Sequence, residues 1–354
     1  MIHIEGSHSE GGGQILRTAL ALSVLTGKPF RADRIRHHRP RPGLKNQHLT
    51  CIRALEQIAK VHVEGARLGS AVIEFFPAAV MPGTYSIDIG TAGSITLLLQ
   101  ALLLPCMFAD GPIQLNVTGG TDTKWSIPID FFSRLILPFF RECAGIELKK
   151  IQRGFYPKGQ GVVELAILPK FHIPGHKDFA DFIARLKTEL PVLQLTQKSA
   201  PIKIQGVSAA SVKLKNAKVA ERQGHGAVGG LHHLCPVEIG NEYCRTASPG
   251  TVISLWTVDQ NRNIYIGADA LGERGKLAEA VGEEAAGKLM RVLNSDAVVD
   301  HHLADNLIPL LALLGGRIIT SKITGHIHAN IYVCEKFLNV HFEIDEKRNE
   351  IAAV

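Results

Sequence analysis

The chain has 354 residues, of which 45% are hydrophobic and 20% are charged, and this balance excludes a globally disordered protein. At roughly 150 residues per domain, the length suggests two domains. The 39 Lys and Arg residues against 33 Asp and Glu give a formal net charge of +6, which favours an anionic partner such as a nucleotide, RNA or DNA, although many ordinary enzymes are equally basic.

No segment of the sequence is expected to enter a membrane or to direct secretion. The N-terminus, MIHIEGSHSEGGG, lacks the basic and apolar regions of a signal peptide. The longest apolar stretch, residues 94–108, contains Gln100 and Pro105 and is too short to cross a bilayer. None of the six cysteines forms a C-x-x-C pair, which indicates reduced thiols rather than a disulfide frame or a zinc site. We therefore expect a soluble, cytoplasmic protein.

In the first half, the spacing of apolar residues predicts strands and helices in regular alternation. The predicted helices are 11–26, 44–60, 93–108 and 129–143, and the predicted strands are 2–5, 30–36, 61–64, 71–76, 85–90, 113–117, 146–150 and 161–167. The order strand, polar loop, helix, strand, strand occurs twice, each time over about fifty residues, which predicts an internal structural repeat.

After residue 169 the pattern changes and predicts a second unit. Helices are expected at 179–186, 216–222, 276–293, 304–314 and 329–337, a glycine- and histidine-rich loop at 224–233, and strands at 202–209, 252–258, 264–266, 318–323 and 340–344. We therefore predict an α/β (α+β) fold. Residues 1–185 and 277–354 would form a repeat-built catalytic domain, and residues 186–276 would form a small inserted α/β domain.

Three glycines after Glu10 open the first long helix, in the segment EGGGQILR (10–17). They let the backbone approach a ligand, and the unpaired N–H groups of a helix start favour an anion. Because Glu10 precedes the helix and Arg17 lies about two turns into it, the segment can hold a metal-bound triphosphate. A glycine turn with a capping Glu is the structural alternative.

The loop before the second long helix carries Arg39 and Arg41 among prolines that restrict the backbone. Gln47 and His48 lie near the same helix start. This arrangement is typical of an anion site, and a solvated loop is the alternative. Gln100 interrupts the most apolar helix, so its amide must pair or face a cavity, since burying it unpaired costs roughly 1–3 kcal/mol.

Common nucleotide and hydrolase motifs are missing from the sequence. It has no Walker A sequence, no G-x-G-x-x-G after a strand and no H-E-x-x-H. Ser94 is expected to cap a helix rather than to act as a nucleophile, because no G-x-S-x-G elbow is present. The segment TGGTD (118–122) is either a turn or a ligand loop. ATP binding, if present, therefore needs another architecture.

Histidines near the C-terminus are the candidates for catalysis. His301, His302 and Asp305 precede an apolar helix, and the segment GHIHAN (325–330) joins a predicted strand to a helix. His326 and His328 are expected to share one face of an extended segment, a spacing that suits zinc as well as catalysis. No cysteine or further histidine cluster completes a tetrahedral site nearby. We therefore prefer an imidazole nucleophile or base beside Asp305.

Six segments, in order, resemble the RNA 3′-terminal phosphate cyclase family. They are EGGGQILR (10–17), RPGLKNQH (41–48), IGTAGSITLLLQ (89–100), TGGTD (118–122), GFYPKGQG (154–161) and HLADN (302–306). The resemblance runs from residue 2 to about 342 and is weakest inside the predicted insert. It implies a large domain of repeated α/β units, related to the enolpyruvyl transferases, with a small inserted α/β domain.

The resemblance also implies a reaction, the ATP-dependent conversion of an RNA 3′-terminal phosphate into a 2′,3′-cyclic phosphodiester. A histidine would attack the α-phosphorus of ATP, release pyrophosphate and hold AMP through a P–N bond. AMP would then pass to the RNA 3′-phosphate, and the adjacent 2′-hydroxyl would displace it. Mg²⁺ or Mn²⁺ and arginines would offset the charge on the phosphates.

The family's site residues fall on matching positions of this sequence. Counting back four residues from Asn330 gives His326 as the nucleophile, with His328 as a second candidate and Ala329 where Thr is usual. Asn306 stands where Gln is more familiar. The resemblance implies cofactor binding by Gln100, His302, Leu303, Ala304, Asp305, Asn306 and Glu10, metal binding by Glu10, and substrate binding by Arg17, Arg39, Arg41, Gln47 and His48.

Two other functions are alternatives to this one. A non-catalytic relative that binds RNA in RNA processing or ribosome assembly would lack the nucleophile, and His326 argues against it. An enolpyruvyl transferase would need a basic pocket for phosphoenolpyruvate, and no motif of that family is present. The expected partner is an RNA with a 3′-phosphate end, and the sequence predicts no oligomeric state.

Overall fold

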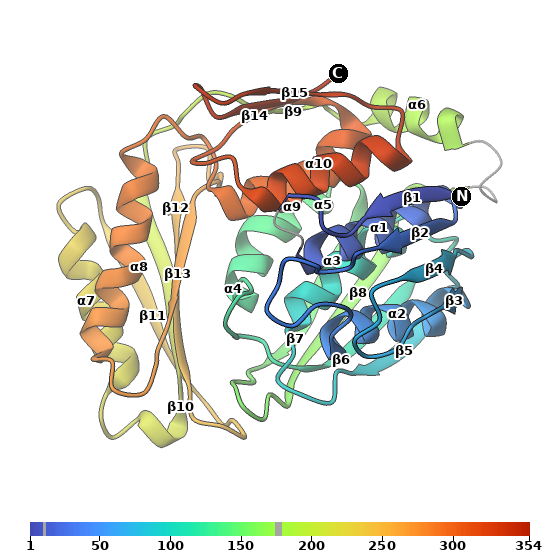
Figure 1. Ribbon diagram of the computed structural model, residues 1–354. Coiled ribbons are helices and arrows are strands. Elements are labelled where there is room, and N and C mark those ends of the chain that lie inside the picture. The colour runs from blue at the N-terminus through green and yellow to red at the C-terminus, as the bar shows by residue number, and fades with distance from the viewer. Residues whose placement is uncertain (10–11, 174–178) are drawn as a thin grey trace.

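The computed structural model describes residues 1–9, 12–173 and 179–354 (Figure 1). Within these residues it has a mixed α/β fold with four four-stranded sheets, and three of the sheets share one topology. In each of the three, the four strands lie in the order 1-2-4-3, counted along the chain. Strands 1 and 2 pair in parallel, and strand 4 pairs antiparallel with strand 2 on one side and with strand 3 on the other. In sheet order they are β1 (Ile2–Glu5), β2 (Phe30–Asp33), β4 (Ile73–Phe76) and β3 (His62–Glu64); β5 (Gly83–Asp88), β6 (Ile113–Gly119), β8 (Gly161–Pro169) and β7 (Ala144–Gln152); and β9 (Leu193–Leu195), β14 (Gly316–Ile319), β16 (Glu350–Ala353) and β15 (Phe342–Asp345).

Each of these sheets comes with two helical segments, in the chain order strand, helix, strand, helix, strand, strand. The first pair is α1 (Gly13–Thr26) and α2 (Asn46–Ala59), and the third pair is α9 (His301–Leu314) and α10 (Gly325–Phe337). In the second repeat, α3 (Ile95–Cys106) is followed by one continuous helical segment of α4 (Ile129–Phe131), the π-helical turn η1 (Phe132–Ile136) and α5 (Leu137–Phe140). The internal repeat predicted from two blocks thus occurs three times.

The third repeat is interrupted between β9 and α9 by a separate unit. Its sheet runs β11 (Val237–Cys244), β10 (Lys203–Ser211), β12 (Thr251–Val258) and β13 (Gly267–Leu271). The helices α7 (Val219–Leu231) and α8 (Ala278–Leu293) cover one face of this sheet (Figure 1) and share a separate apolar core with it. The short η2 (Val212–Leu214) follows β10, and α6 (Phe179–Glu189) precedes β9.

This packing bears on where the inserted domain begins and ends. The predicted limits of 186 and 276 would assign β9 to the insert and α8 to the catalytic domain. However, β9 pairs with β14 of the third repeat, and α8 buries Val281, Ala285 and Leu289 in the core of the inserted unit. We therefore propose that the insert runs from the end of β9 to the start of α9.

Several predicted elements of the insert were wrong. Residues 224–233, predicted as a loop, lie mostly in helix α7, and the strand predicted at 264–266 is not formed there, since β13 occupies the following residues, Gly267–Leu271. The strand β11 was not predicted. Glycine lowers helix propensity, but here it permits close packing: a Cβ at Gly226 would lie 2.2 Å from the Glu279 carbonyl oxygen, and one at Gly282 would lie 2.0 Å from that of Gln223. The packing of α7 on α8 therefore overrides the local preference.

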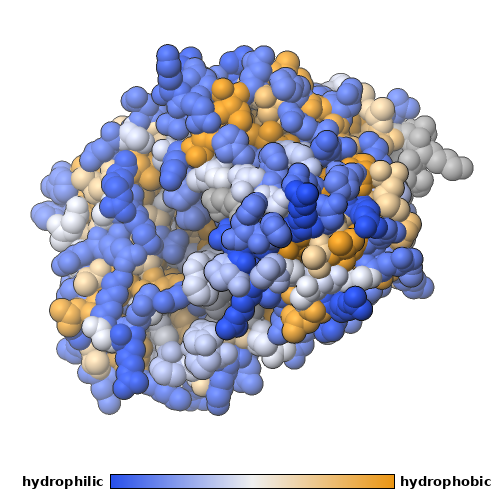
Figure 2. All heavy atoms as spheres, viewed as in Figure 1, coloured by the Kyte–Doolittle hydropathy of each residue, from blue (hydrophilic) through white to orange (hydrophobic). Residues whose placement is uncertain are grey.

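The helices α1, α3 and α9 lie in the middle of the repeat-built part and are buried along almost their whole length. Such helices are apolar on all sides, so the few polar residues on them must pair inside the protein. In the part of the chain that the structure describes, no helix is long and apolar enough to cross a membrane. The face seen in Figure 2 is mostly hydrophilic, with scattered hydrophobic residues.

A buried arginine joins the inserted unit to the second repeat. Arg153, only 3% exposed, forms salt bridges with Asp122 (3.2 Å) and Asp130 (2.7 Å) and with Glu242 of β11 (2.7 Å). The oxygen of Asp122 that contacts Arg153 also accepts a hydrogen bond from the Thr121 hydroxyl. The segment TGGTD is therefore a structural turn that supplies one carboxylate of this clamp.

Candidate active site

His326 and Asp305 meet at the start of α10. The Nδ1 atom of His326 lies 3.7 Å from Oδ2 of Asp305, and the His326 side chain is half exposed. Thr324 caps α10 by accepting a hydrogen bond from the amide of Ile327 at 3.2 Å. The imidazole therefore lies in the first turn of a helix, where the backbone dipole favours an anion such as phosphate.

Asn330 fixes the position of Asp305. Its Nδ2 donates to Asp305 Oδ1 at 2.7 Å and to the Asp305 carbonyl at 2.9 Å. Its Oδ1 accepts from Gln14 Nε2 at 3.1 Å and from the Thr18 hydroxyl at 2.6 Å. The amide is fully buried and all of these bonds cross between helices. One oxygen of Asp305 is thus held by α10 itself, and the other faces His326.

Arg17 is a buried cation held by amides. Its Nε donates to Gln100 Oε1 at 3.1 Å, and its Nη2 donates to Gln14 Oε1. Burial lowers the pKa of Arg17, with the nearby charge of Asp305 acting in the opposite direction. Among the described residues, no carboxylate forms a salt bridge with it. Its charge is therefore available to an anion bound beside α1.

His48 is a neutral hydrogen-bond donor on the other side of the α1 start. Its Nδ1 accepts from the amide of Lys45 at 3.0 Å, so the hydrogen of the neutral ring is on Nε2. Burial, followed by the charge of Arg17, lowers the pKa of His48 to about 3. A Cβ at Gly13 would lie only 2.2 Å from Nε2. The absence of a side chain at Gly13 is what lets this imidazole approach the helix.

Arg39 also lies at the start of α1, and Arg41 does not. The Nη2 of Arg39 lies 3.4 Å from the position of a Cβ on Gly12. The side chain of Arg41 is exposed, and its carbonyl accepts from Arg36 Nη1 at 3.2 Å within the loop. The structure therefore brings the first of the two predicted arginines, but not the second, to the cluster around His48 and Arg17.

Gln47 has a structural role in the chain as described. Its Oε1 accepts from the amide of Ser94 at 2.8 Å, and its Nε2 donates to the carbonyl of the same residue at 3.0 Å. This pair ties the start of α2 to the start of α3. Ser94 caps α3 by accepting from the Leu97 amide, as predicted.

The HLADN segment forms the first turns of α9. Asp300 caps this helix by accepting from the amides of His302 and Leu303, both at 2.9 Å. Leu303 and Ala304 are buried in the core, so their side chains do not face a ligand. His302 is exposed and its ring lies 5.8 Å from that of Phe131 in an edge-on arrangement. Exposed atoms of His302 therefore remain for contact with a ligand.

Gln100 and Asn306 connect this segment to Arg17. Gln100 Nε2 donates to Asn306 Oδ1 at 2.8 Å, and Asn306 Nδ2 donates to the His302 carbonyl at 2.8 Å. The amide of Gln100, expected to pair or to face a cavity, does both. It lines a small cavity of about 30 Å³ together with the polar residues Asp305, Asn306 and Asn330 and the apolar residues Phe132, Ile136 and Phe140.

The two candidate histidines point to different partners. The prediction that His326 and His328 share one face of an extended segment was wrong, because both lie in α10. Two residues apart on a helix, side chains diverge by about 200°. The Nε2 of His328 lies 3.6 Å from Glu346 Oε1, whereas His326 faces Asp305. The geometry separates the two candidates, which sequence spacing alone did not.

The predicted metal ligand Glu10 lies outside the described residues. Among those that are described, no group of three His, Cys, Asp or Glu residues is arranged to hold a metal ion. A magnesium ion in a nucleotide site needs fewer protein ligands, since it binds one or two carboxylates together with substrate phosphates. Asp305, with one oxygen facing the site, together with the donors of Arg17 and His48, fits such a metal–phosphate group.

Sequence reasoning missed Gln14, Thr18 and Asp300, and used Asn330 only to count residues. The signal for the first two was present in the sequence, as polar residues four apart in an otherwise apolar helix. A fully buried helix must pair such residues with another element. The identity of that partner, Asn330, lies more than 300 positions away and needed the structure.

Comparison of the sequence with known proteins shows the family to which the chain belongs. A family model described as RNA 3′-terminal phosphate cyclase matches residues 8–344. A protein of Archaeoglobus fulgidus called RNA 3′-terminal phosphate cyclase is 44% identical over 349 residues, covering 97% of this chain and 98% of the relative. Proteins with the same name from Pyrococcus abyssi (42% over 348 residues, 98% and 95%) and Methanopyrus kandleri (40% over 364 residues, 100% and 98%) are also similar. The chain is therefore an enzyme of the RNA 3′-terminal phosphate cyclase family.

Proposed function

We propose that this chain uses ATP to convert an RNA 3′-terminal phosphate into a 2′,3′-cyclic phosphodiester, with His326 as the nucleophile that carries AMP. The observation that carries the proposal is the pair of His326 Nδ1 and Asp305 Oδ2, 3.7 Å apart, with Asp305 held by Asn330. At 3.7 Å this contact is electrostatic, and the negative charge of Asp305 favours the hydrogen on Nδ1 and the lone pair on Nε2. That lone pair is what attacks phosphorus.

The first step balances as a phosphoryl substitution. His326 Nε2 attacks the α-phosphorus of ATP, the bond from that phosphorus to the bridging oxygen breaks, and pyrophosphate leaves with the electron pair. Asp305 stabilises the positive charge that develops on the ring. In the second step, an oxygen of the RNA 3′-phosphate displaces His326 and takes AMP. In the third, the vicinal 2′-hydroxyl loses its proton, attacks the same 3′-phosphorus and releases AMP.

The phosphates are held at the start of α1. Arg17 contributes a buried positive charge, His48 an Nε2–H donor, and Gly12 and Gly13 the close approach of the backbone. Arg39, beside Gly12, is proposed to hold the phosphate of the RNA end or of the nucleotide. Arg41, exposed on the loop before α2, is proposed for the outer part of the same substrate site. Gln47, whose amide is bonded to the Ser94 backbone, is proposed to hold the start of α2 beside that site rather than to bind the substrate itself.

The nucleoside of ATP is proposed to bind against α9. The exposed ring of His302, the amides of Gln100 and Asn306, and the backbone of Leu303 and Ala304 line this side. Glu10 is proposed to hold Mg²⁺ or Mn²⁺ together with Asp305 and the phosphates. The metal would offset negative charge as pyrophosphate leaves.

The experiment is to incubate the protein with α-³²P-labelled ATP and Mg²⁺, without RNA, and to measure label that stays on the chain. Wild type and His328→Ala should both be labelled, and His326→Ala should not. The adduct should be labile in acid and stable in alkali, as expected of a phosphoramidate. The same variants are then assayed for cyclisation of an oligoribonucleotide 3′-phosphate. Wild-type protein that binds RNA but takes no label would instead support a non-catalytic RNA-binding role.

A further inference from the structure

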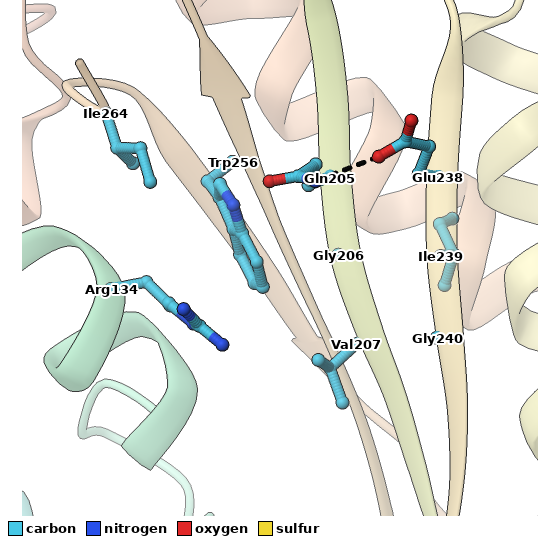
Figure 3. Close-up of a pocket in the computed structure, with 9 residues that line it drawn as sticks. All are labelled: Arg134, Gln205, Gly206, Val207, Glu238, Ile239, Gly240, Trp256 and Ile264. Atoms are coloured by element: carbon cyan, nitrogen blue, oxygen red, sulfur yellow. Dashed lines mark hydrogen bonds between the residues drawn. The ribbon is translucent and has the colours of Figure 1, made fainter. Parts of the chain in front are cut away.

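A second cavity, of about 550 Å³, lies between the inserted sheet and the π-helical turn η1 (Figure 3). On the sheet side, Glu238, Gln205 and Trp256 form one row across β11, β10 and β12, because Gln205 is in register with both neighbours. From η1, Arg134 extends toward this row, and its guanidinium lies 5.6 Å from the centre of the Trp256 ring. A cavity of this size can hold a drug-sized molecule.

Two buried polar groups on this face of β12 have no hydrogen-bond partner among the described residues. Trp256 is 4% exposed, and its Nε1–H donor is unpaired. The hydroxyl of Ser254, two residues away on the same side of the strand, is also unpaired. Buried polar groups in folded proteins are nearly always paired, so an unpaired indole N–H lining a cavity favours a ligand with an acceptor.

The cavity lies next to the candidate active site. Phe132 and Ile136 of η1 line the small cavity that contains Gln100 and Asp305, while Arg134 lines the larger one. The two hollows therefore lie on opposite sides of one helical segment, about 10–12 Å across. A Cβ on Gly240 of the edge strand β11 would meet only the Gly206 carbonyl oxygen, at 3.9 Å, so the sheet side of the larger cavity is open.

We propose that this second cavity binds a base of the RNA strand upstream of its reacting 3′ end, an assignment that rests on the proposed function. A flipped-out base stacks on the exposed face of the Arg134 guanidinium, whose inner face covers the Trp256 ring, as single-stranded RNA does on aromatic and arginine planes. The Trp256 N–H donates to a ring nitrogen or carbonyl of the base. Gln205 Nε2 already donates to Glu238 Oε2 at 2.8 Å, so Glu238 Oε1 remains to accept from an exocyclic amino group.

The chemistry of the row predicts a base preference. Adenine, cytosine and guanine carry exocyclic amino groups and uracil does not. An oligoadenylate should therefore bind more tightly than an oligouridylate of the same length.

Tryptophan fluorescence tests binding directly. The chain has two tryptophans, and Trp125 is 93% exposed, so Trp125→Phe leaves Trp256 as the single indole. Without ATP, an oligoadenylate with a 3′-phosphate should quench Trp256, and Arg134→Ala should weaken this binding by about tenfold, the order expected for one stacked base. Arg134→Lys, which keeps the charge but not the plane, should not restore it. Arg291→Ala, on α8 at the opposite face of the sheet, is the matched control and should bind as before.

Kinetics separate this site from the reaction itself. Arg134→Ala should raise KM for an oligonucleotide about tenfold, but leave ATP labelling and the cyclisation of a nucleoside 3′-phosphate unchanged, because that substrate is too short to reach the cavity. RNA that is bound and cyclised without any change in Trp256 fluorescence would overturn the proposal. So would equal quenching by ATP alone, which indicates a mononucleotide pocket. Failure of the proposed function would appear instead as loss of labelling in wild type.

Discussion

Adding one methyl group at Gly13 should disable the phosphate site while leaving the fold largely intact. In Gly13→Ala, the new Cβ would lie 2.2 Å from His48 Nε2 and 3.1 Å from Arg17 Nη1. The His48 ring is buried and its Nδ1 is bonded to the Lys45 amide, so it cannot rotate away. Because non-bonded heavy atoms are normally separated by about 3.5 Å, either the His48 ring or the start of α1 must move by about 1 Å.

The expected effects on stability and on activity differ in size. Overpacking costs about 1–3 kcal/mol, and replacing Gly by Ala in a helix returns up to about 1 kcal/mol, so the free energy of unfolding should fall by at most about 3 kcal/mol. A misplacement of about 1 Å at the phosphate site should slow AMP labelling about 100-fold. Urea unfolding and the initial rate of labelling by ATP measure the two quantities.

Gly287→Ala, in helix α8 and away from the site, is the matched control. Its Cβ would have only Arg291 Nη1 nearby, at 3.8 Å, so labelling should not change. If Gly13→Ala labels as fast as Gly287→Ala, then the start of α1 does not hold the phosphates in the way proposed above.

Three further changes test the parts that support the site. Asn330→Ala leaves its buried partners Asp305, Gln14 and Thr18 unpaired, so the free energy of unfolding in urea should fall by about 2–5 kcal/mol and labelling by ATP should be slower. The control Asn294→Ala removes an exposed side chain and should leave the free energy of unfolding unchanged. Equal losses in the two variants would contradict a stabilising role for the Asn330 hydrogen bonds. His48 takes up a proton below about pH 6.5 in the unfolded chain but only below about pH 3 in the folded chain, so the free energy of unfolding falls as the pH is lowered through this window, by about 2 kcal/mol at pH 5. His48→Asn should remove that part of the pH dependence. If the free energy of unfolding of His48→Asn varies with pH as that of wild type does, then His48 titrates normally. Arg153→Ala leaves three carboxylates without their cation and should cost about 3–5 kcal/mol in denaturant unfolding, so a loss below about 1 kcal/mol would show that the clamp contributes little.

Much of the repeat-built fold could be predicted because its strands and helices carry strong local signals. The helices around 11–26, 93–108 and 304–314 are long apolar runs with clear ends, and the structure has α1, α3 and α9 there. The third repeat was not predicted as a repeat, because the insert separates β9 from α9. Of helix α7, only residues 219–222 fell within a predicted helix; the glycine-rich remainder was predicted as a loop, because those glycines are explained only by the close packing on α8.

Sequence motifs named individual candidate residues of the site, but they did not indicate how these residues are arranged in space. His326 and Asp305 were placed side by side by motif, and the structure puts them 3.7 Å apart. The network through Gln14, Thr18 and Asn330 could not be predicted, because partners on α1 and α10 are distant in sequence and pair only when the first and third repeats pack together. Gln47 was assigned to substrate, whereas its amide pairs with the Ser94 backbone, a contact that no local pattern indicates.

The most direct test of the central claim is to locate AMP on the protein. Wild-type protein is incubated with ATP and Mg²⁺ without RNA, kept at alkaline pH, digested and analysed by mass spectrometry with fragmentation of the peptide that contains both His326 and His328. The account predicts the added AMP on His326, its disappearance in acid, and its transfer when an RNA 3′-phosphate is supplied before digestion. AMP on His328, on a lysine or on no residue would contradict the assignment of His326 as the nucleophile.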